Sequence, residues 1–249
     1  MIQAFETYHF KHRRKKTKTF SLFLLKTALF SLLLYLLLNA FFISSFFVGS
    51  ESMNPAIKAG ERLFILPIAY RIRLPFFQRS IGGIQKPARG DVVVIISPQY
   101  PRLGFFQSIA DPLVRFFSLQ KASLVRDSRG REAGKYMLKR VIGIPGDTVR
   151  LDDFEAFLKT GSSSTFVGEK DIISVPYSIN TRLSLDGWSS DLPFSGNREE
   201  VRLGEDEYFL LGDNRPYSSD SRSWGAVSIE SFVGKVFLRY WPFKKFGKP

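Results

Sequence analysis

One long apolar segment near the N-terminus dominates the hydrophobic pattern of the chain. Residues 27–48 (TALFSLLLYLLLNAFFISSFFV) carry no charged side chain. At about 1.5 Å per residue a helix of this length extends about 33 Å, enough to cross the roughly 30 Å hydrocarbon core of a bilayer. The pattern therefore predicts a transmembrane helix over 27–48, after a basic segment over 1–26 and before a folded domain over 49–249.

The rest of the chain has the pattern of short β-strands. Runs rich in β-branched and aromatic residues alternate with Gly, Pro and Asp. The expected strands are 61–66, 91–97, 136–142, 147–151, 172–177, 207–211 and 232–241. Regular helix–strand alternation, which a parallel α/β sheet would need, is missing from the sequence. We expect an all-β domain with complex, partly coiled sheets and with surface loops at 160–165 and 184–197.

An insert over about 98–134 departs from this pattern. Within residues 102–120, large apolar side chains recur at helical spacing, although Pro112 disfavours one continuous helix. The helical positions are Phe106, Ile109, Ala110, Leu113 and Phe117. One interpretation is a helix packed on the core. The other is an interfacial segment, because Phe and Leu flanked by Arg suit a lipid headgroup boundary.

Charge predicts the orientation of the chain in the membrane. The net charge is +13, and residues 11–18 (KHRRKKTK) precede the apolar segment. The positive-inside rule keeps this cluster cytoplasmic and places the domain outside the cytoplasm. A cleavable secretory signal is the alternative, but such signals usually have apolar cores of about 7–15 residues. No helix-turn-helix, RNP-like or zinc-finger pattern occurs in the sequence, so we expect no nucleic-acid partner.

The domain after the apolar segment lacks both cysteine and histidine, which limits its possible chemistry. The chain has no cysteine, and its only histidines, His9 and His12, precede the apolar segment. Thiol catalysis, disulfides, a Ser-His-Asp triad and a histidine-ligated zinc site are therefore excluded from the domain. A general base there must be Lys, Asp, Glu or Tyr, and we expect neither a metal nor an organic cofactor.

Ser52 and Lys139 are the candidates for nucleophilic chemistry. Ser52 lies four residues beyond the apolar segment, in a Pro- and Gly-containing stretch that suits a defined loop. On a strand over 136–142, Lys139 shares a face with Met137 and Val141. Loss of hydration there would lower the lysine pKa, and a neutral amine can remove a serine proton. The alternatives are an ordinary turn serine and a lysine whose ammonium reaches solvent.

A third cluster over 212–222 (GDNRPYSSDSR) predicts a structured loop with a possible Asp220–Arg222 ion pair. A solvated turn would explain it equally well. Taken together and in this order, the clusters resemble the motifs of bacterial type I signal peptidases. The matching stretches are 52–55 (SMNP), 89–92 (RGDV), 139–147 (KRVIGIPGD) and 212–225 (GDNRPYSSDSRSWG). The chain departs from the family at Ala56, usually Thr, at Gly49, often Pro, and in its long insert.

The resemblance implies a role for each matching residue. Ser52 corresponds to the nucleophile, Lys139 to the general base, and Ser50 to a hydroxyl that lines the oxyanion hole with the Ser52 N–H. Ser218 corresponds to the hydroxyl that orients the lysine, and Asp220 and Arg222 to a pair that supports the loop. The pockets for the substrate side chains at −1 and −3 would be lined by Met53, Ile57, Met137 and Leu138. The strand ending at Lys139 would pair with an extended substrate.

These expectations describe a serine endopeptidase of the plasma (inner) membrane, in contact with membrane lipids. It would remove signal peptides from secreted and membrane preproteins, cutting after small residues with a Ser-Lys dyad. A Ser-Lys self-cleaving protease of the repressor type is a rival enzyme, but that class is cytosolic and lacks a long N-terminal span. A rival of another class is a membrane-anchored binding scaffold without protease activity.

Overall fold

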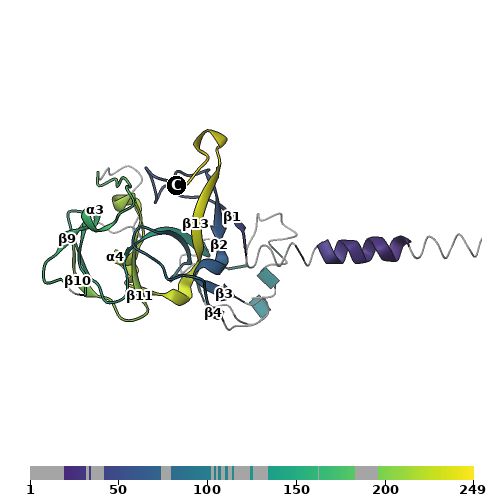
Figure 1. Cartoon of the computed structure of the whole chain (residues 1–249), viewed down its shortest axis with the longest axis horizontal. Helices are drawn as coiled ribbons and strands as arrows, with labels where there is room; N and C mark the ends of the chain where they lie inside the picture. Colours follow the sequence, from purple (N-terminus) through teal and green to yellow (C-terminus); the bar gives the residue numbers. More distant parts are fainter. Residues whose placement is uncertain are drawn as a thin grey trace, which may run out of the picture.

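A computed structural model describes the chain over residues 20–31, 34, 42–73, 80–101, 134–161, 163–182 and 196–249, with short fragments between 104 and 125. Figure 1 shows a β-rich domain and, apart from it, the helix formed by residues 20–31. All strand pairings among the described residues are antiparallel, apart from one isolated parallel bridge. The expected β-rich domain is confirmed.

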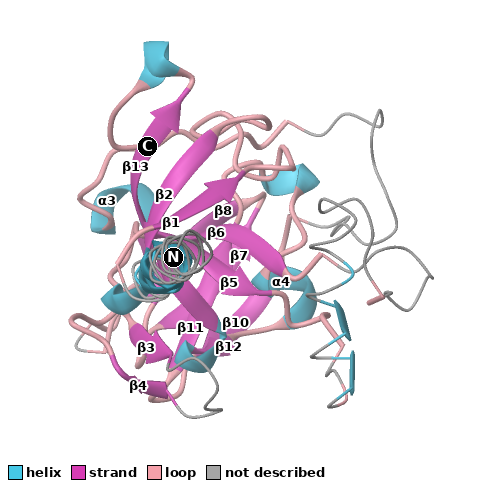
Figure 2. Cartoon of the chain, turned by 90° about the vertical axis from the view of Figure 1, so that its right-hand side faces the viewer, coloured by secondary structure: helices cyan, strands magenta, loops and turns pink. Residues whose placement is uncertain are grey.

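A seven-stranded sheet organises the domain, in the order β1-β2-β13-β5-β6-β11-β12. Its strands are β1 (Ser44–Phe47), β2 (Arg62–Leu66), β5 (Val92–Ile96), β6 (Tyr136–Gly143), β11 (Glu207–Leu211), β12 (Val227–Ser228) and β13 (Phe232–Trp241). Strands distant in sequence, such as β2 and β13, are therefore neighbours in the sheet. Figure 2 shows the strands in magenta.

Two smaller sheets and a few short helices complete the fold. A four-stranded sheet has the order β10-β7-β8-β9, and β3 pairs with β4. These strands are β3 (Arg71–Arg73), β4 (Ser80–Gly82), β7 (Thr148–Asp152), β8 (Glu155–Lys159), β9 (Val167–Gly168) and β10 (Arg198–Arg202). The helices are η1 (Pro67–Ala69), α3 (Glu169–Ile172), η2 (Arg215–Tyr217), α4 (Ser221–Trp224), η3 (Ile229–Ser231) and η4 (Phe243–Lys245).

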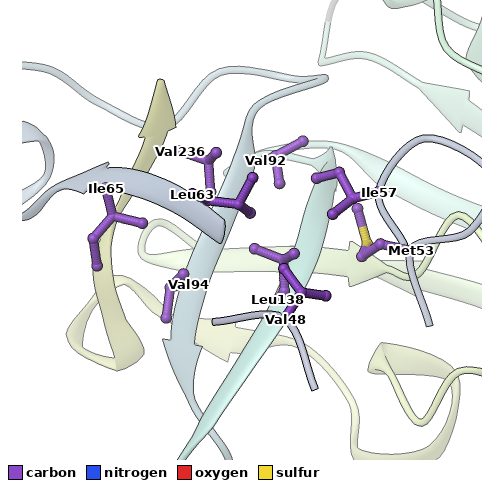
Figure 3. Close-up of a cluster of buried hydrophobic side chains, with 9 residues drawn as sticks. All are labelled: Val48, Met53, Ile57, Leu63, Ile65, Val92, Val94, Leu138 and Val236. Carbon is purple, nitrogen blue, oxygen red and sulfur yellow. The ribbon is translucent and has the colours of Figure 1, made fainter. Parts of the chain in front are cut away.

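Alternation along the strands separates the apolar side chains into clusters. Leu63 and Ile65 of β2, and Val92 and Val94 of β5, enter one cluster because alternate residues of a strand share a face. Val93 and Ile95 of β5 enter a second cluster on the opposite face. Figure 3 shows the first cluster, which also contains side chains from the loop after β1. The central strands are thus buried on both faces.

One predicted strand is wrong and several observed strands were not predicted. Residue 172 ends α3, and 173–177 form no strand, because Pro176 has no N–H to donate to a ladder. The Tyr177 side chain is held near α3, since its hydroxyl donates to Glu169 at 2.5 Å. The other six predicted runs contain strands β2, β5, β6, β7, β11 and β13. The strands that the pattern did not predict are β1, β3, β4, β8, β9, β10 and β12.

The C-terminal end of the predicted transmembrane segment needs correction. Ser44–Phe47 form β1, which pairs with residues 62–65 of β2, and Val48 is buried in the first core cluster. Phe46 also packs against that cluster, whereas Phe47 is 58% exposed, and the strand shows that the helix does not extend to Val48. Residues 20–31 are helical, whereas 32–33 and 35–41 lie outside the described residues. No helix in the described part of the chain is both long and apolar enough to cross a membrane.

Most of the insert over 98–134 and of the loop over 184–197 lies outside the described residues. Where the insert is described, Phe106 is 85% exposed, while Asp111 and Val125 are buried. The Asp111 carboxylate accepts a hydrogen bond from the Leu124 N–H at 2.7 Å. The described fragments therefore include both buried and exposed positions, and the two interpretations of the insert stay open.

Candidate active site

Ser52 lies in the loop that joins β1 to β2. The ends of this loop are tied together, because the Val48 N–H donates to the Glu61 carbonyl at 3.0 Å and the Gly60 N–H donates to the Val48 carbonyl at 2.8 Å. Ser52 itself is only 8% exposed. The loop closure thus holds the serine against the sheet rather than on a projecting turn.

Lys139 reaches Ser52 from the middle of β6. Its Nζ lies 3.2 Å from the Ser52 Oγ, and the side chain is 3% exposed. Burial lowers the pKa of Lys139 to about 8, with Arg222 acting in the same direction and the carboxylates of Asp220 and Asp213 opposing it. The structure therefore brings together the two residues predicted to share a proton, and the direction of the pKa shift agrees with the prediction.

Ser50 adds a second hydroxyl beside the nucleophile. The Oγ atoms of Ser50 and Ser52 are 3.2 Å apart, and Ser50 is exposed to solvent. Among the described residues, nothing accepts a hydrogen bond from the Ser52 N–H. A hydroxyl and a backbone N–H at such a position can stabilise negative charge on an oxygen that develops next to Ser52.

The loop after β11 places the charges of Asp220 and Arg222 near the lysine. Asp220 and Arg222 form a buried ion pair at 2.8 Å, and Asp220 also accepts a hydrogen bond from the Gly212 N–H at 3.2 Å. Burial alone would raise the pKa of Asp220, but the charge and hydrogen bonds of Arg222 outweigh it and lower the pKa. The carboxylate therefore stays ionised and holds the start of the loop in place.

Ser218 is buried in this loop, but no described residue forms a hydrogen bond with its hydroxyl. The predicted hydrogen bond to Lys139 is therefore not observed. Ser218 and the Ser52 carbonyl come close to each other because residue 212 is a glycine. A Cβ at this position would be 2.2 Å from the Ser218 Oγ and 2.5 Å from the Ser52 carbonyl oxygen. Ser218 thus approaches the site, and its role in orienting the lysine stays a prediction.

The four residues expected to line substrate pockets divide between two clusters. Met53, Ile57 and Leu138 are buried together in the first core cluster, and Figure 3 shows the Met53 sulfur beside Ile57. Met137 is partly buried and packs against the second cluster. The structure therefore unites three of the four in one buried cluster, in which two residues of the Ser52 loop pack with Leu138 of β6.

Sequence reasoning missed a buried ion pair next to the dyad. Arg140 donates to both carboxylate oxygens of Asp213, at 2.8 and 2.7 Å, and to the Gly90 carbonyl at 2.9 Å. This pair fastens β6 to the loop that carries Asp220, and bidentate geometry makes the contact specific. Both residues lie in motifs recognised in the sequence, but a single sequence could not show that they pair. The described residues contain no group of carboxylates or other ligands that could hold a metal ion.

Comparisons with known proteins identify the family of the chain. The profile of the family described as "Signal peptidase, peptidase S26" matches residues 21–241. Signal peptidase I of Pseudomonas fluorescens is 28% identical over 236 residues, covering 85% of this chain and 70% of that protein. Signal peptidase I of Bacillus licheniformis is 26% identical over 239 residues, covering 96% and 97%.

Among solved structures, a signal peptidase I from Enterococcus faecalis V583 is 23% identical and covers 61% of this chain and 98% of that one. Its TM-score is 0.32, a value too low to relate the two folds. Family membership therefore rests on the sequence profile, which extends from the N-terminal helix to the last residue of β13. The chain belongs to the signal peptidase family, peptidase S26.

Proposed function

We propose that this signal peptidase cleaves signal peptides from translocated preproteins with Ser52 as nucleophile and Lys139 as general base. The family consists of serine endopeptidases that perform this reaction, and the proposal assigns the residues that carry it out here. The observation that supports it best is the 3.2 Å contact between the Ser52 Oγ and the buried Lys139 Nζ. A lysine with a pKa of about 8 is neutral often enough near neutral pH to act as a base.

The reaction follows from this contact. The neutral Lys139 amine takes the proton of the Ser52 hydroxyl while Oγ attacks the scissile carbonyl carbon. The resulting oxyanion accepts hydrogen bonds from the Ser52 N–H and the Ser50 hydroxyl. The Lys139 ammonium then gives its proton to the leaving amine, and the C–N bond breaks to leave an ester on Ser52. Water, deprotonated by Lys139, hydrolyses the ester and restores the serine.

An open edge of β6 provides a place for the substrate. On one side, residues 136–140 of β6 pair with β5, whereas on the other side β11 pairs only with residues 140–143. Among the described residues, no strand pairs with residues 136–139 on this second side, so we expect their backbone groups to pair with an added extended strand. A strand bound there would run past Lys139. Met53, Ile57 and Leu138 are already packed together next to the serine, and we expect this packing to favour small substrate side chains near the cleavage site.

The proposed location is the plasma (inner) membrane, with the N-terminus cytoplasmic and the catalytic domain outside. The basic residues 11–18 and the apolar residues that follow them support this orientation. In cells stripped of any outer layer, added protease should digest the catalytic domain and spare a tag on the N-terminus. Digestion of the tag with an intact domain would refute the orientation.

Purified full-length protein in detergent, incubated with a signal-peptide substrate, tests the activity. Wild type should cleave after a small residue, and Ser52→Ala and Lys139→Ala should each lose most activity while remaining folded. The two residues act as one unit, so the double variant should be little worse than either single one. A wild-type protein that binds preprotein without cutting it would favour the binding scaffold instead.

A further inference from the structure

We propose that Asn180, which lies outside the recognised motifs, is a positioning residue for the oxyanion hole, acting through Asn214. The Asn180 Nδ2 donates to the Asn214 Oδ1 at 2.9 Å, and the Asn214 Nδ2 donates to the Glu51 carbonyl at 3.0 Å. This series of amide hydrogen bonds, from Asn180 through Asn214 to Glu51, is called the amide relay below. It rests on the proposed function, because it orients a group that only a reaction at Ser52 requires.

The relay ends on the peptide unit that carries the oxyanion donor. The Glu51 carbonyl and the Ser52 N–H belong to the same peptide group, and in a trans peptide they point in opposite directions. The carbonyl accepts hydrogen bonds from the Asn214 Nδ2 and from the Asn54 N–H, both at 3.0 Å. Two donors to the carbonyl oxygen therefore fix the orientation of this rigid group, with the Ser52 N–H pointing away from them.

Asn214 also forms a hydrogen bond with the next carbonyl along the chain, that of Ser52. Its backbone N–H donates to the Ser52 carbonyl at 3.0 Å, and the residue is 5% exposed. Asn214 thus holds the peptide groups on both sides of the nucleophile, one with its side chain and one with its backbone. A side-chain amide, however, presents an oxygen or an NH₂ group depending on how it is turned. Something must keep its NH₂ group towards Glu51.

Asn180 supplies that constraint. Its Oδ1 accepts a hydrogen bond from the Arg182 N–H at 3.1 Å, which leaves its Nδ2 to face Asn214. Because the Asn180 Nδ2 is a donor, the Asn214 amide must turn its Oδ1 towards Asn180, which turns its Nδ2 towards Glu51. Backbone bonds hold Asn180 in place, from its N–H to the Asp213 carbonyl at 2.8 Å and from the Arg215 N–H to its own carbonyl at 2.9 Å. These backbone bonds do not depend on the side chain.

Asn180→Ala tests the relay because it removes the amide and keeps these backbone bonds. Removing an oxyanion donor outright lowers kcat by about 10²–10³-fold. Loosening one should cost less, and we expect kcat to fall by about 10-fold to 100-fold with KM unchanged. The pH at which activity rises should stay the same, because Lys139 is not touched. Asn180→Asp should be at least as impaired, since its carboxylate turns the Asn214 amide away from Glu51.

A double-variant cycle separates this role from a purely structural one. If Asn180 acts only through Asn214, then Asn180→Ala should cause little further loss of kcat in an Asn214→Ala background. The matched control is Asn197→Ala, which removes an amide that accepts from the Asp153 N–H at 2.8 Å and should leave kcat unchanged.

Three results would refute the relay: an unchanged kcat in Asn180→Ala, a rise in KM that accounts for the loss, or fully additive losses in the double variant. Each of these presumes that the wild type cleaves and that Ser52→Ala does not. If the wild type left the substrate intact, the proposed function itself would fail. The two failures are therefore distinguishable in one experiment.

Discussion

Replacing Lys139 by methionine should destroy activity and stabilise the fold at the same time. The lysine lies 3% exposed in the middle of β6, and methionine has a similar length without the charge. Burial lowers the pKa of the Lys139 ammonium from 10.5 to about 8, so the folded state binds its proton less tightly than the unfolded chain does. At a pH below 8 both states are protonated, and folding must bury the charge.

The cost of that burial follows from the two pKa values. A tenfold difference in proton affinity is worth about 1.4 kcal/mol, so a fall from 10.5 to about 8 destabilises the protonated fold by about 3 kcal/mol. The penalty is complete below pH 8, shrinks as the pH rises, and vanishes above about pH 10.5, where both states are neutral. Lys139→Met should therefore raise the melting temperature at pH 6 by about 6–12 °C.

The measurement is thermal unfolding of full-length wild type and variant in the same detergent, at pH 6, 8 and above 10. The exposed Lys135, just before β6, provides the control, because Lys135→Met removes a charge that water solvates in both states. Equal stability of wild type and Lys139→Met at pH 6 would refute the reasoning. So would a gain in stability that does not diminish as the pH rises.

Three further outcomes are expected. The rate of cleavage should rise with pH through about 8 as Lys139 loses its proton, whereas a maximum in acid would point to a carboxylate base. Lys139→Arg should be inactive, because guanidinium stays charged. Gly212→Ala should lower kcat by about 10²-fold, because its Cβ would lie 2.5 Å from the Ser52 carbonyl oxygen, and kinetics near the wild-type value would contradict this. Asp213→Ala should lower the free energy of unfolding by about 3–5 kcal/mol in denaturant, because it leaves the buried charge of Arg140 unpaired. Replacing both residues by apolar ones should lower it much less.

The local pattern predicted six strands, among them β5, β6 and β11, which are buried along most of their length. The β-branched residues of β5 and the mixed run of β6 were recognisable because strand composition and core position coincide there. The pattern failed where a tertiary contact overrides local preference. Residues 44–47 read as the end of a membrane helix, but their pairing with β2 makes them a strand. A single apolar run cannot reveal where lipid contact ends and sheet contact begins.

The residues of the site also divide into those that the sequence predicted and those that only the folded structure reveals. The motifs identified Ser52 and Lys139, and apolar neighbours on the strand explained the lowered pKa of the lysine. The sequence could not predict the hydrogen bonds of Asn214 to the Ser52 loop and to Asn180. They depend on amide orientations and on loops that meet only in the folded chain. Burial of Met53 was likewise invisible in a stretch that reads as a polar turn.

The separation in sequence of the groups around Ser52 has a consequence for how the enzyme matures. Lys139 lies 87 residues from the serine it contacts, and Asn214 lies 163 residues from the carbonyl it holds. Closing such long loops is entropically costly, and folds built on distant contacts form slowly. With Ser52 as nucleophile and Lys139 as base, as proposed, a nascent chain that has joined β1 to β2 contains the serine but not yet the lysine or the Asn214 side chain. We therefore expect activity to appear only when the long-range pairings of the sheet have formed.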